Sequence, residues 1–181
     1  KRVGVRISLE GPWTSYTKNR VTYSYFGLSK IGEWIETLAI DSQMLSNESL
    51  GQDLLAYSGS FAGIVESESE ILAFVDSVRS IPIFFSIAGS DCTVSNSARH
   101  LQQLSSTSQI NLVGLSEFTS GGYVTGNSTL YTDLFQLRAG ELMRLDKMQS
   151  KVQIFRYYQY APRLDKQSEH EIYLRKLGNI V

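Results

Sequence analysis

Three short, continuous apolar runs in the middle of the chain constrain its fold more than any other feature. The links between them are too short to hold a crossover helix, as with the polar link of residues 66–70 (ESESE). Short continuous runs are typical of strands that are covered on both faces. We therefore predict antiparallel strands lying between other layers, over residues 60–65 (SFAGIV), 71–75 (ILAFV) and 81–87 (IPIFFSI).

The rest of the chain supplies further strands and short helices around this centre. Alternating or β-branched patterns predict strands over residues 3–9, 20–26, 129–137, 141–146 and 152–158. Apolar residues at helical spacing predict helices over residues 33–45, 49–57, 98–104, 110–118 and 168–181. Sheets that are covered by helices on one face and by another sheet on the other predict an α+β fold, a layered αββα sandwich of antiparallel sheets.

The charge balance and the apolar pattern exclude several classes of partner. Lys and Arg total 17 and Asp and Glu total 18 among 181 residues, a net charge of −1. The basic footprint of a nucleic-acid-binding protein is therefore absent. No apolar run approaches the roughly 18 residues of a membrane-spanning helix, so we expect no membrane partner.

The single cysteine and the start of the chain bear on where the protein resides. Cys92 has no partner for an internal disulfide, which favours a reducing compartment, and we predict the cytoplasm. The chain opens at Lys1 rather than at Met, so we expect this point to be a processing site or the edge of a longer sequence.

The residue types that carry metal or nucleophilic chemistry are sparse. His100 and His170 lie in predicted helices, and with one cysteine and no His-x-x-x-His pattern we predict no metal site. Cys92 is eight residues from His100, but the adjacent Asp91 opposes the lowered thiol pKa that a nucleophile needs. We therefore predict a buried structural cysteine and two surface histidines.

Two further segments have a polar pattern with more than one interpretation. Residues 120–122 (SGG) match the start of a phosphate-cradling loop, but residues 123–125 (YVT) depart from it, so we predict a flexible loop. Asp76 and Arg79 flank a strand end, where a carboxylate and a guanidinium three residues apart can form a charge-assisted pair that orders a turn. A contact of this turn with a ligand is the alternative, and the residues alone leave it open.

Three segments share their order and spacing with one enzyme family. They are residues 55–65, residues 72–85 with Asp76 and Pro82 in a pattern similar to Arg-Asp-x-x-Gly-x-x-Pro-Leu-Tyr, and residues 122–141. The chain thereby resembles the N-terminal glutaminase domain of asparagine synthetases, a class II glutamine amidotransferase with the N-terminal-nucleophile (Ntn) hydrolase fold. Within that family it is most similar to asparagine-synthase-related proteins of bacterial polysaccharide clusters, which are thought to amidate sugar carboxylates.

The resemblance implies that the family's reaction has been lost. The family uses a cysteine at its first residue, whose free amine serves as the base, whereas this chain opens with Lys1 and has its cysteine at position 92. The family's substrate-gripping Arg-Gly-Pro-Asp loop has no counterpart. Its oxyanion-hole Asn-Gly aligns with Phe26 and Gly27, so a donor typically worth about 3 kcal/mol is replaced by a phenyl ring. We therefore predict no catalytic residue and a glutaminase-inactive domain.

The resemblance also implies a domain organisation and partners. We predict an amidotransferase-like domain over residues 1–160, without a cofactor, and a linker with a first helix over residues 161–181. These lead toward a C-terminal synthetase domain that requires ATP and magnesium. The predicted role is structural or docking, with that synthetase domain as partner and a homodimer as a further expectation.

Two alternatives remain, and both keep the fold. In the first, the chain is a working glutamine-hydrolysing half whose cysteine segment precedes Lys1. In the second, it is a ligand-binding module that uses the old glutamine pocket. For substrate or ligand binding we predict Gly27, Asp76 and Arg79.

Overall fold

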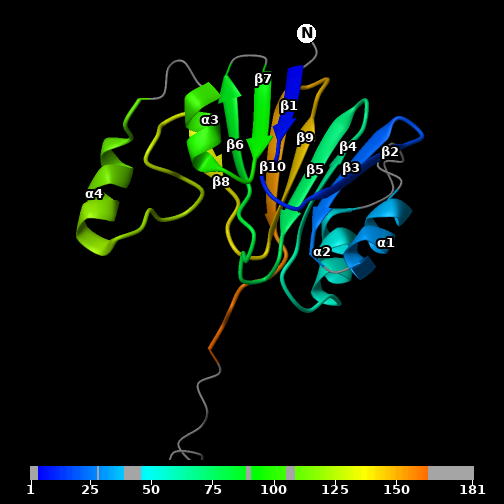
Figure 1. The fold of residues 1–181 in the computed structure, drawn as a ribbon. Helices are drawn as coiled ribbons and strands as arrows, with labels where there is room; N and C mark the ends of the chain where they lie inside the picture. The colour runs from blue at the N-terminus through cyan, green and yellow to red at the C-terminus, as the bar shows by residue number, and fades with distance from the viewer. Residues whose placement is uncertain (1–3, 28, 39–45, 89–90, 105–108, 163–181) are drawn as a thin grey trace, which may run out of the picture.

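Two stacked β-sheets form the body of the molecule (Figure 1). The computed structural model describes residues 4–27, 29–38, 46–88, 91–104 and 109–162. A four-stranded sheet has the order β1-β7-β6-β8, and a six-stranded sheet has the order β10-β9-β5-β4-β3-β2. The strands are β1 (Gly4–Ser8), β2 (Thr14–Lys18), β3 (Val21–Phe26), β4 (Ala62–Glu66), β5 (Glu70–Val75), β6 (Phe84–Ala88), β7 (Asp91–Ser95), β8 (Leu134–Gln136), β9 (Glu141–Asp146) and β10 (Lys151–Arg156).

One apolar core lies between the two sheets. The inward faces of β4, β5 and β9 supply small and branched side chains such as Ala62, Ile64 and Ala73, and β6 and β7 supply Phe85 and Val94 from the other sheet. These side chains are at most 2% exposed. Burial on both faces explains why the central strands have continuous apolar runs rather than an alternating pattern.

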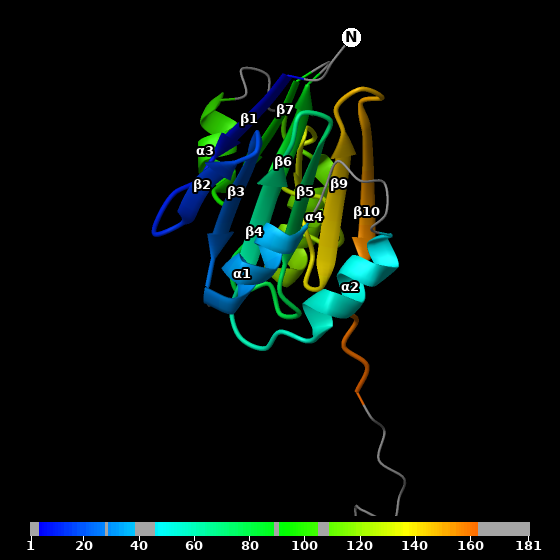
Figure 2. The same ribbon diagram turned by 90° about the vertical axis from the view of Figure 1, so that its right-hand side faces the viewer.

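Helices α1 (Ser29–Thr37) and α2 (Asn47–Leu55) cover the outer face of the six-stranded sheet (Figure 2). Ile31, Trp34 and Ile35 of α1 lie at helical spacing and pack with Phe74 and Leu142 of the sheet. At the start of α2 the side chain of its N-cap serine accepts a hydrogen bond from a backbone N–H of the first turn, which stabilises the helix end. The side chains between these two helices and the sheet form the second apolar core of the molecule.

The other sheet carries α3 (Ala98–Leu104) on its outer face, where Leu101 is buried. Figure 1 shows α4 (Leu112–Gly121) beyond α3, standing off from both sheets. The order of layers is therefore helix, sheet, sheet, helix, which confirms the predicted α+β sandwich. None of the helices within the described ranges has the length and apolar character needed to cross a membrane.

The structure corrects the predicted elements in several places. Two strands that the sequence did not predict, β2 and β7, are present, and β1 pairs in parallel with β7, so the four-stranded sheet is mixed rather than wholly antiparallel. The predicted helix over residues 33–45 begins earlier and ends at Thr37, with residues 39–45 outside the described residues. The predicted helix over residues 168–181 also lies outside the described residues, as does all of the predicted 161–181 segment beyond residue 162.

Candidate functional site

Asp76 connects two of the three segments that carry the family resemblance, residues 55–65 and 72–85, at one end of the six-stranded sheet. It follows β5 and is 1% exposed. Its carboxylate accepts hydrogen bonds from the backbone N–H groups of Phe61 (3.1 Å), Val78 (2.8 Å) and Ser80 (3.1 Å). Both oxygens are therefore occupied by the protein itself, as in a carboxylate that orders a turn.

The backbone of Asp76 also bonds to the third segment, residues 122–141. Its carbonyl oxygen accepts hydrogen bonds from the N–H groups of Arg79 (3.1 Å) and Gly140 (2.9 Å), and its own N–H donates to the carbonyl of Phe61 (3.1 Å). Residues 61, 76 and 140 come from distant parts of the sequence. The turn that the sequence predicted at Asp76 is thus present, with backbone groups as the main partners of the carboxylate.

Gly27 lies against the backbone of Ser60 and Phe61, the two residues that precede β4. Its φ is +118°, a conformation that favours glycine, and a Cβ there would lie against the carbonyl oxygen of Ser60 and 3.0 Å from the Cα of Phe61. The structure therefore brings Gly27 and Asp76 together around the backbone of Phe61. The binding role predicted for these two residues stays a prediction.

Phe26 occupies the position where the family resemblance places an oxyanion-hole asparagine. Its ring packs edge-on against Trp13, with the ring centroids 6.1 Å apart and an interplanar angle of 65°. Trp13 belongs to the segment before β2, which the sequence analysis did not identify as structured. The Phe26 side chain therefore presents carbon at this position and has no hydrogen-bond donor to direct at a substrate.

The Arg79 side chain packs against Phe84. Its guanidinium carbon lies 5.3 Å from the centroid of the Phe84 ring, its buried Nε has no hydrogen-bond partner among the described residues, and its φ is +59°. Desolvation by burial lowers the pKa of Arg79 from its ordinary value. The ion pairs found in the described part of the chain do not include the predicted side-chain pair between Asp76 and Arg79.

Arg79 lines an open pocket of about 710 Å³ between the turn of residues 76–80 and the segment that follows α4. Aromatic side chains form much of its wall, and Gln136 and Arg138 contribute polar groups. The lining residues include Arg79 but neither Gly27 nor Asp76, so the three predicted site residues do not share one cavity. The aromatic lining residues that sequence reasoning missed are Phe84, Phe118, Tyr123 and Tyr131.

A buried ionic network supports one side of this pocket. Glu141 is fully buried, and its carboxylate accepts hydrogen bonds from Nε of Arg138 (2.6 Å) and Nδ2 of Asn127 (2.6 Å). Arg156 lies 3.5 Å from the same carboxylate. Two arginines around one carboxylate leave a net positive charge beside the pocket.

Cys92 and His100 do not form a reactive pair within the described contacts. Cys92 is 1% exposed between the sheets, and desolvation raises the pKa of its thiol to about 11, which confirms the predicted structural cysteine. The Nε2 atom of His100 lies 2.8 Å from the Ser8 hydroxyl, and its Nδ1 lies 3.7 Å from the Glu10 carboxylate. His100 is thus half-buried between helix α3 and the end of β1, whereas His170 lies outside the described residues.

The segment of residues 120–122 is a helix end, so the predicted flexible loop is wrong. Ser120 and Gly121 belong to the last turn of α4, and Gly122 caps it with φ +78° and an N–H that donates to the Phe118 carbonyl. A helix C-terminus carries partial negative charge, which is unfavourable for the phosphate contact considered from the sequence.

A scan against protein-family models and a search of curated proteins both find no match. Among solved structures, the chain is similar to the glutamine phosphoribosylpyrophosphate amidotransferase from B. subtilis complexed with ADP and GMP, with a TM-score of 0.36 and 12% identity over 81% of this chain and 31% of that one. It is also similar to "the allosteric regulatory enzyme of purine biosynthesis", with a TM-score of 0.35 and 10% identity over the same shares, 81% and 31%.

The first of these two structures is that of a glutamine amidotransferase, and neither is described as an asparagine synthetase. The chain spans about a third of the length of each matched structure, at 31%. Both TM-scores are low and both identities are below 25%, so these matches carry no functional conclusion for this chain.

Proposed function

We propose that this chain is an amidotransferase-like domain that does not hydrolyse glutamine and that docks onto an amide-forming catalytic domain. The proposed partner is an ATP- and magnesium-dependent synthetase domain of the same protein, related to asparagine synthases and acting on sugar carboxylates in the cytoplasm. The observation that carries the proposal is the exposed apolar surface of α4, and the state of Phe26 and Cys92 supports the loss of hydrolysis.

The two residues closest to the family's chemistry are engaged in packing. Phe26 packs on Trp13 where the resemblance calls for an oxyanion donor. Loss of one such donor typically lowers kcat by a factor of about 10²–10³. Cys92 is buried with a thiol pKa raised to about 11, so it is protonated near neutral pH and is a poor nucleophile.

Helix α4 exposes apolar side chains where a solvated helix would carry charges. Leu112, Val113 and Leu115 are 76%, 70% and 40% exposed, and Glu117 is the one charged residue between Leu112 and Gly121. Six of the thirteen large exposed apolar side chains among the described residues lie between positions 110 and 123. A concentration of this kind marks an interaction surface on a soluble domain.

The orientation of α4 indicates which face is available. Gly114 is buried, and a Cβ there would lie 2.7 Å from the Thr129 carbonyl oxygen, so this side of the helix faces the body. Leu112 lies on the side of the helix away from Gly114, and Leu115, three residues further on, lies next to Leu112 on the helix surface. We define the α4 surface as Leu112, Val113 and Leu115.

The docking role predicts protection of α4 by the rest of the protein. We expect backbone amides of residues 110–124 to exchange hydrogen more slowly in the full-length gene product than in the 181-residue chain. Leu112→Ser with Leu115→Ser should abolish this difference. Leu55→Ser, at a leucine that is 45% exposed at the end of α2, is the matched control and should leave it unchanged. Equal exchange in the two proteins would contradict docking, and protection that depends on chain concentration would indicate a homodimer instead.

The absence of hydrolysis needs its own assay. We expect the full-length gene product to release no glutamate from glutamine above a buffer control, while amide formation with ammonium proceeds. Release of glutamate at an enzymatic rate would overturn the proposal and establish the alternative of a working glutaminase half. Phe26→Asn in the full-length product tests whether the lost donor alone limits the reaction.

A further inference from the structure

The guanidinium of Arg79 is partly buried, and none of the ion pairs among the described residues neutralises it. It is desolvated enough to lower its pKa, its Nε has no hydrogen-bond partner, and its backbone has a φ of +59°. A buried Nε–H without a hydrogen-bond partner and a left-handed backbone at a non-glycine residue both cost free energy. Perturbed charged groups cluster at functional sites, which makes Arg79 a candidate to meet an anionic ligand.

The wall around Arg79 fits the body of an organic molecule. The pocket has a volume of about 710 Å³, within the range of roughly 300–1,000 Å³ that small-molecule sites occupy. The Phe84 ring packs against the guanidinium of Arg79, with 5.3 Å between the guanidinium carbon and the ring centroid. Phe118 of α4 and Tyr131 of the segment after it add further ring surface to the wall. Phe118 is 46% exposed, so its ring is open to a ligand.

The charged groups around the pocket are predominantly positive. Arg79 and Arg138 are the charged residues of its lining within the described part of the chain. Glu141 is shared by Arg138 and Arg156, which leaves one positive charge in excess on that side. The carboxylate of Glu117, beside the rim, is held by the hydroxyl of Thr125 at 2.6 Å and by its N–H at 2.9 Å.

We propose that this pocket binds a small organic monoanion with an aromatic or alkyl body, whose carboxylate pairs with the guanidinium of Arg79. The planar guanidinium matches a carboxylate bidentately, and the rings of Phe84 and Phe118 take the body. The C-terminal end of α4, with its partial negative charge, lies at the rim next to Tyr123, so it opposes a phosphate dianion more strongly than a carboxylate monoanion. This inference concerns a small ligand and stands whether or not α4 docks onto a partner.

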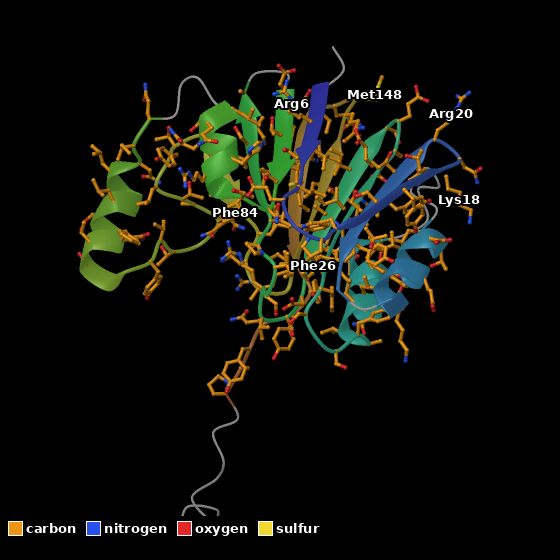
Figure 3. All side chains as sticks on the ribbon, viewed as in Figure 1. Arg6, Lys18, Arg20, Phe26, Phe84 and Met148 are labelled. Atoms are coloured by element: carbon orange, nitrogen blue, oxygen red, sulfur yellow. The ribbon has the colours of Figure 1, made fainter. Side chains whose placement is uncertain are left out.

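The chain offers a matched pair of arginines for the test. Arg20 also has a positive φ, +65°, and lies exposed in the turn between β2 and β3, on the opposite side of the molecule from Phe84 (Figure 3). Asparagine tolerates this backbone conformation, so Arg79→Asn and Arg20→Asn remove one guanidinium each with similar effects on folding.

The experiment measures binding of three probes by isothermal titration calorimetry: 4-phenylbutyrate, its neutral analogue 4-phenylbutan-1-ol, and phenyl phosphate. We expect saturable binding of phenylbutyrate, weakened at least about tenfold by Arg79→Asn and unchanged by Arg20→Asn. The alcohol should bind more weakly to the wild type and be insensitive to Arg79→Asn. Phe118→Ala should weaken the acid and the alcohol alike, because it removes part of the wall that receives the body.

Three results would overturn the proposal. The first is phenylbutyrate affinity that does not change in Arg79→Asn, while circular dichroism shows both arginine variants folded. The second is the absence of saturable binding of phenylbutyrate and of its homologues with one and two fewer methylenes. The third is tighter binding of phenyl phosphate than of phenylbutyrate, which would assign the pocket to a phosphate ligand.

Discussion

The carboxylate of Asp76 should be worth about 3 kcal/mol of folding free energy, and Asp76→Asn tests this value. One oxygen receives the N–H of Val78 and the other that of Phe61, with Ser80 shared between them. An asparagine keeps one acceptor and places an NH₂ group against the remaining donor. Loss of a bond to a charged acceptor costs about 1.5–3 kcal/mol, and a buried N–H without a partner costs about 1–3 kcal/mol, with overlap between the two.

Urea unfolding followed by the fluorescence of Trp13 and Trp34 measures the loss. With a slope of about 2 kcal/mol per molar urea, the midpoint of Asp76→Asn should fall by on the order of 1.5 M. Asp91→Asn, at an exposed aspartate at the start of β7, is the control and should change the midpoint little. An Asp76→Asn variant within about 0.5 kcal/mol of wild type would refute the assignment of Asp76 as the residue that holds the three segments together.

Three further predictions address other parts of the structure. Gly27→Ala should destabilise the fold by more than Gly126→Ala in urea unfolding, because a Cβ at Gly27 meets the Ser60 carbonyl whereas at Gly126, with φ +68°, it meets nothing within 4 Å. Equal losses would contradict this close approach. Folding raises the pKa of Cys92 from 9.0 to about 11, so its contribution to stability should be complete below about pH 9 and decline as the pH rises toward 11. Correspondingly, Ellman's reagent should label Cys92 at pH 8 at the rate of global unfolding, and immediate labelling would disprove its burial. Hydrogen bonds from the Thr125 hydroxyl and N–H lower the pKa of Glu117, so Thr125→Val should raise it toward its ordinary value in a carboxyl NMR titration.

The strands buried on both faces could be predicted from the sequence. The apolar runs of β4, β5 and β9 meet the second sheet on one side and α1 and α2 on the other, so burial and sequence pattern coincide. The polar link between β4 and β5 is a hairpin turn, as expected, with the Ser67 hydroxyl bonded to the N–H of Glu70 at 3.1 Å. The local apolar pattern was therefore sufficient to predict a strand wherever apolar side chains cover both of its faces.

Strands whose partners are distant in sequence could not be predicted. β2 is an edge strand with the sequence TSYTK and exposed side chains, so it lacks the alternation of a half-buried strand. β7 lies inside its sheet, yet its sequence DCTVS is short and half polar, and its burial depends on pairing with β1 and β6. Both pairings involve tertiary context that overrides weak local preference.

The candidate site was predicted in part. An acidic residue at a strand end predicted an ordered turn at Asp76, and that turn is present. The expected partner of the Asp76 carboxylate was the Arg79 guanidinium, whereas the observed partners are backbone N–H groups. The pocket depends on Phe84, Phe118 and Tyr131 from three separate elements, and such convergence leaves no spacing signal in a single sequence. The low charge of residues 110–124 is the one local sign that this segment differs from an ordinary surface helix.

The parallel pairing of β1 with β7 has a consequence for the order of folding. Gly4 pairs with Asp91, so β1 must wait until more than 80 later residues have been made, whereas β2 with β3 and β4 with β5 each pair as a local hairpin. Closing so long a loop is slow compared with forming adjacent hairpins. The six-stranded sheet therefore assembles its early strands while β1 is still unpaired. During synthesis, the open edge of β7 and the free β1 strand form the point at which two nascent chains can exchange strands.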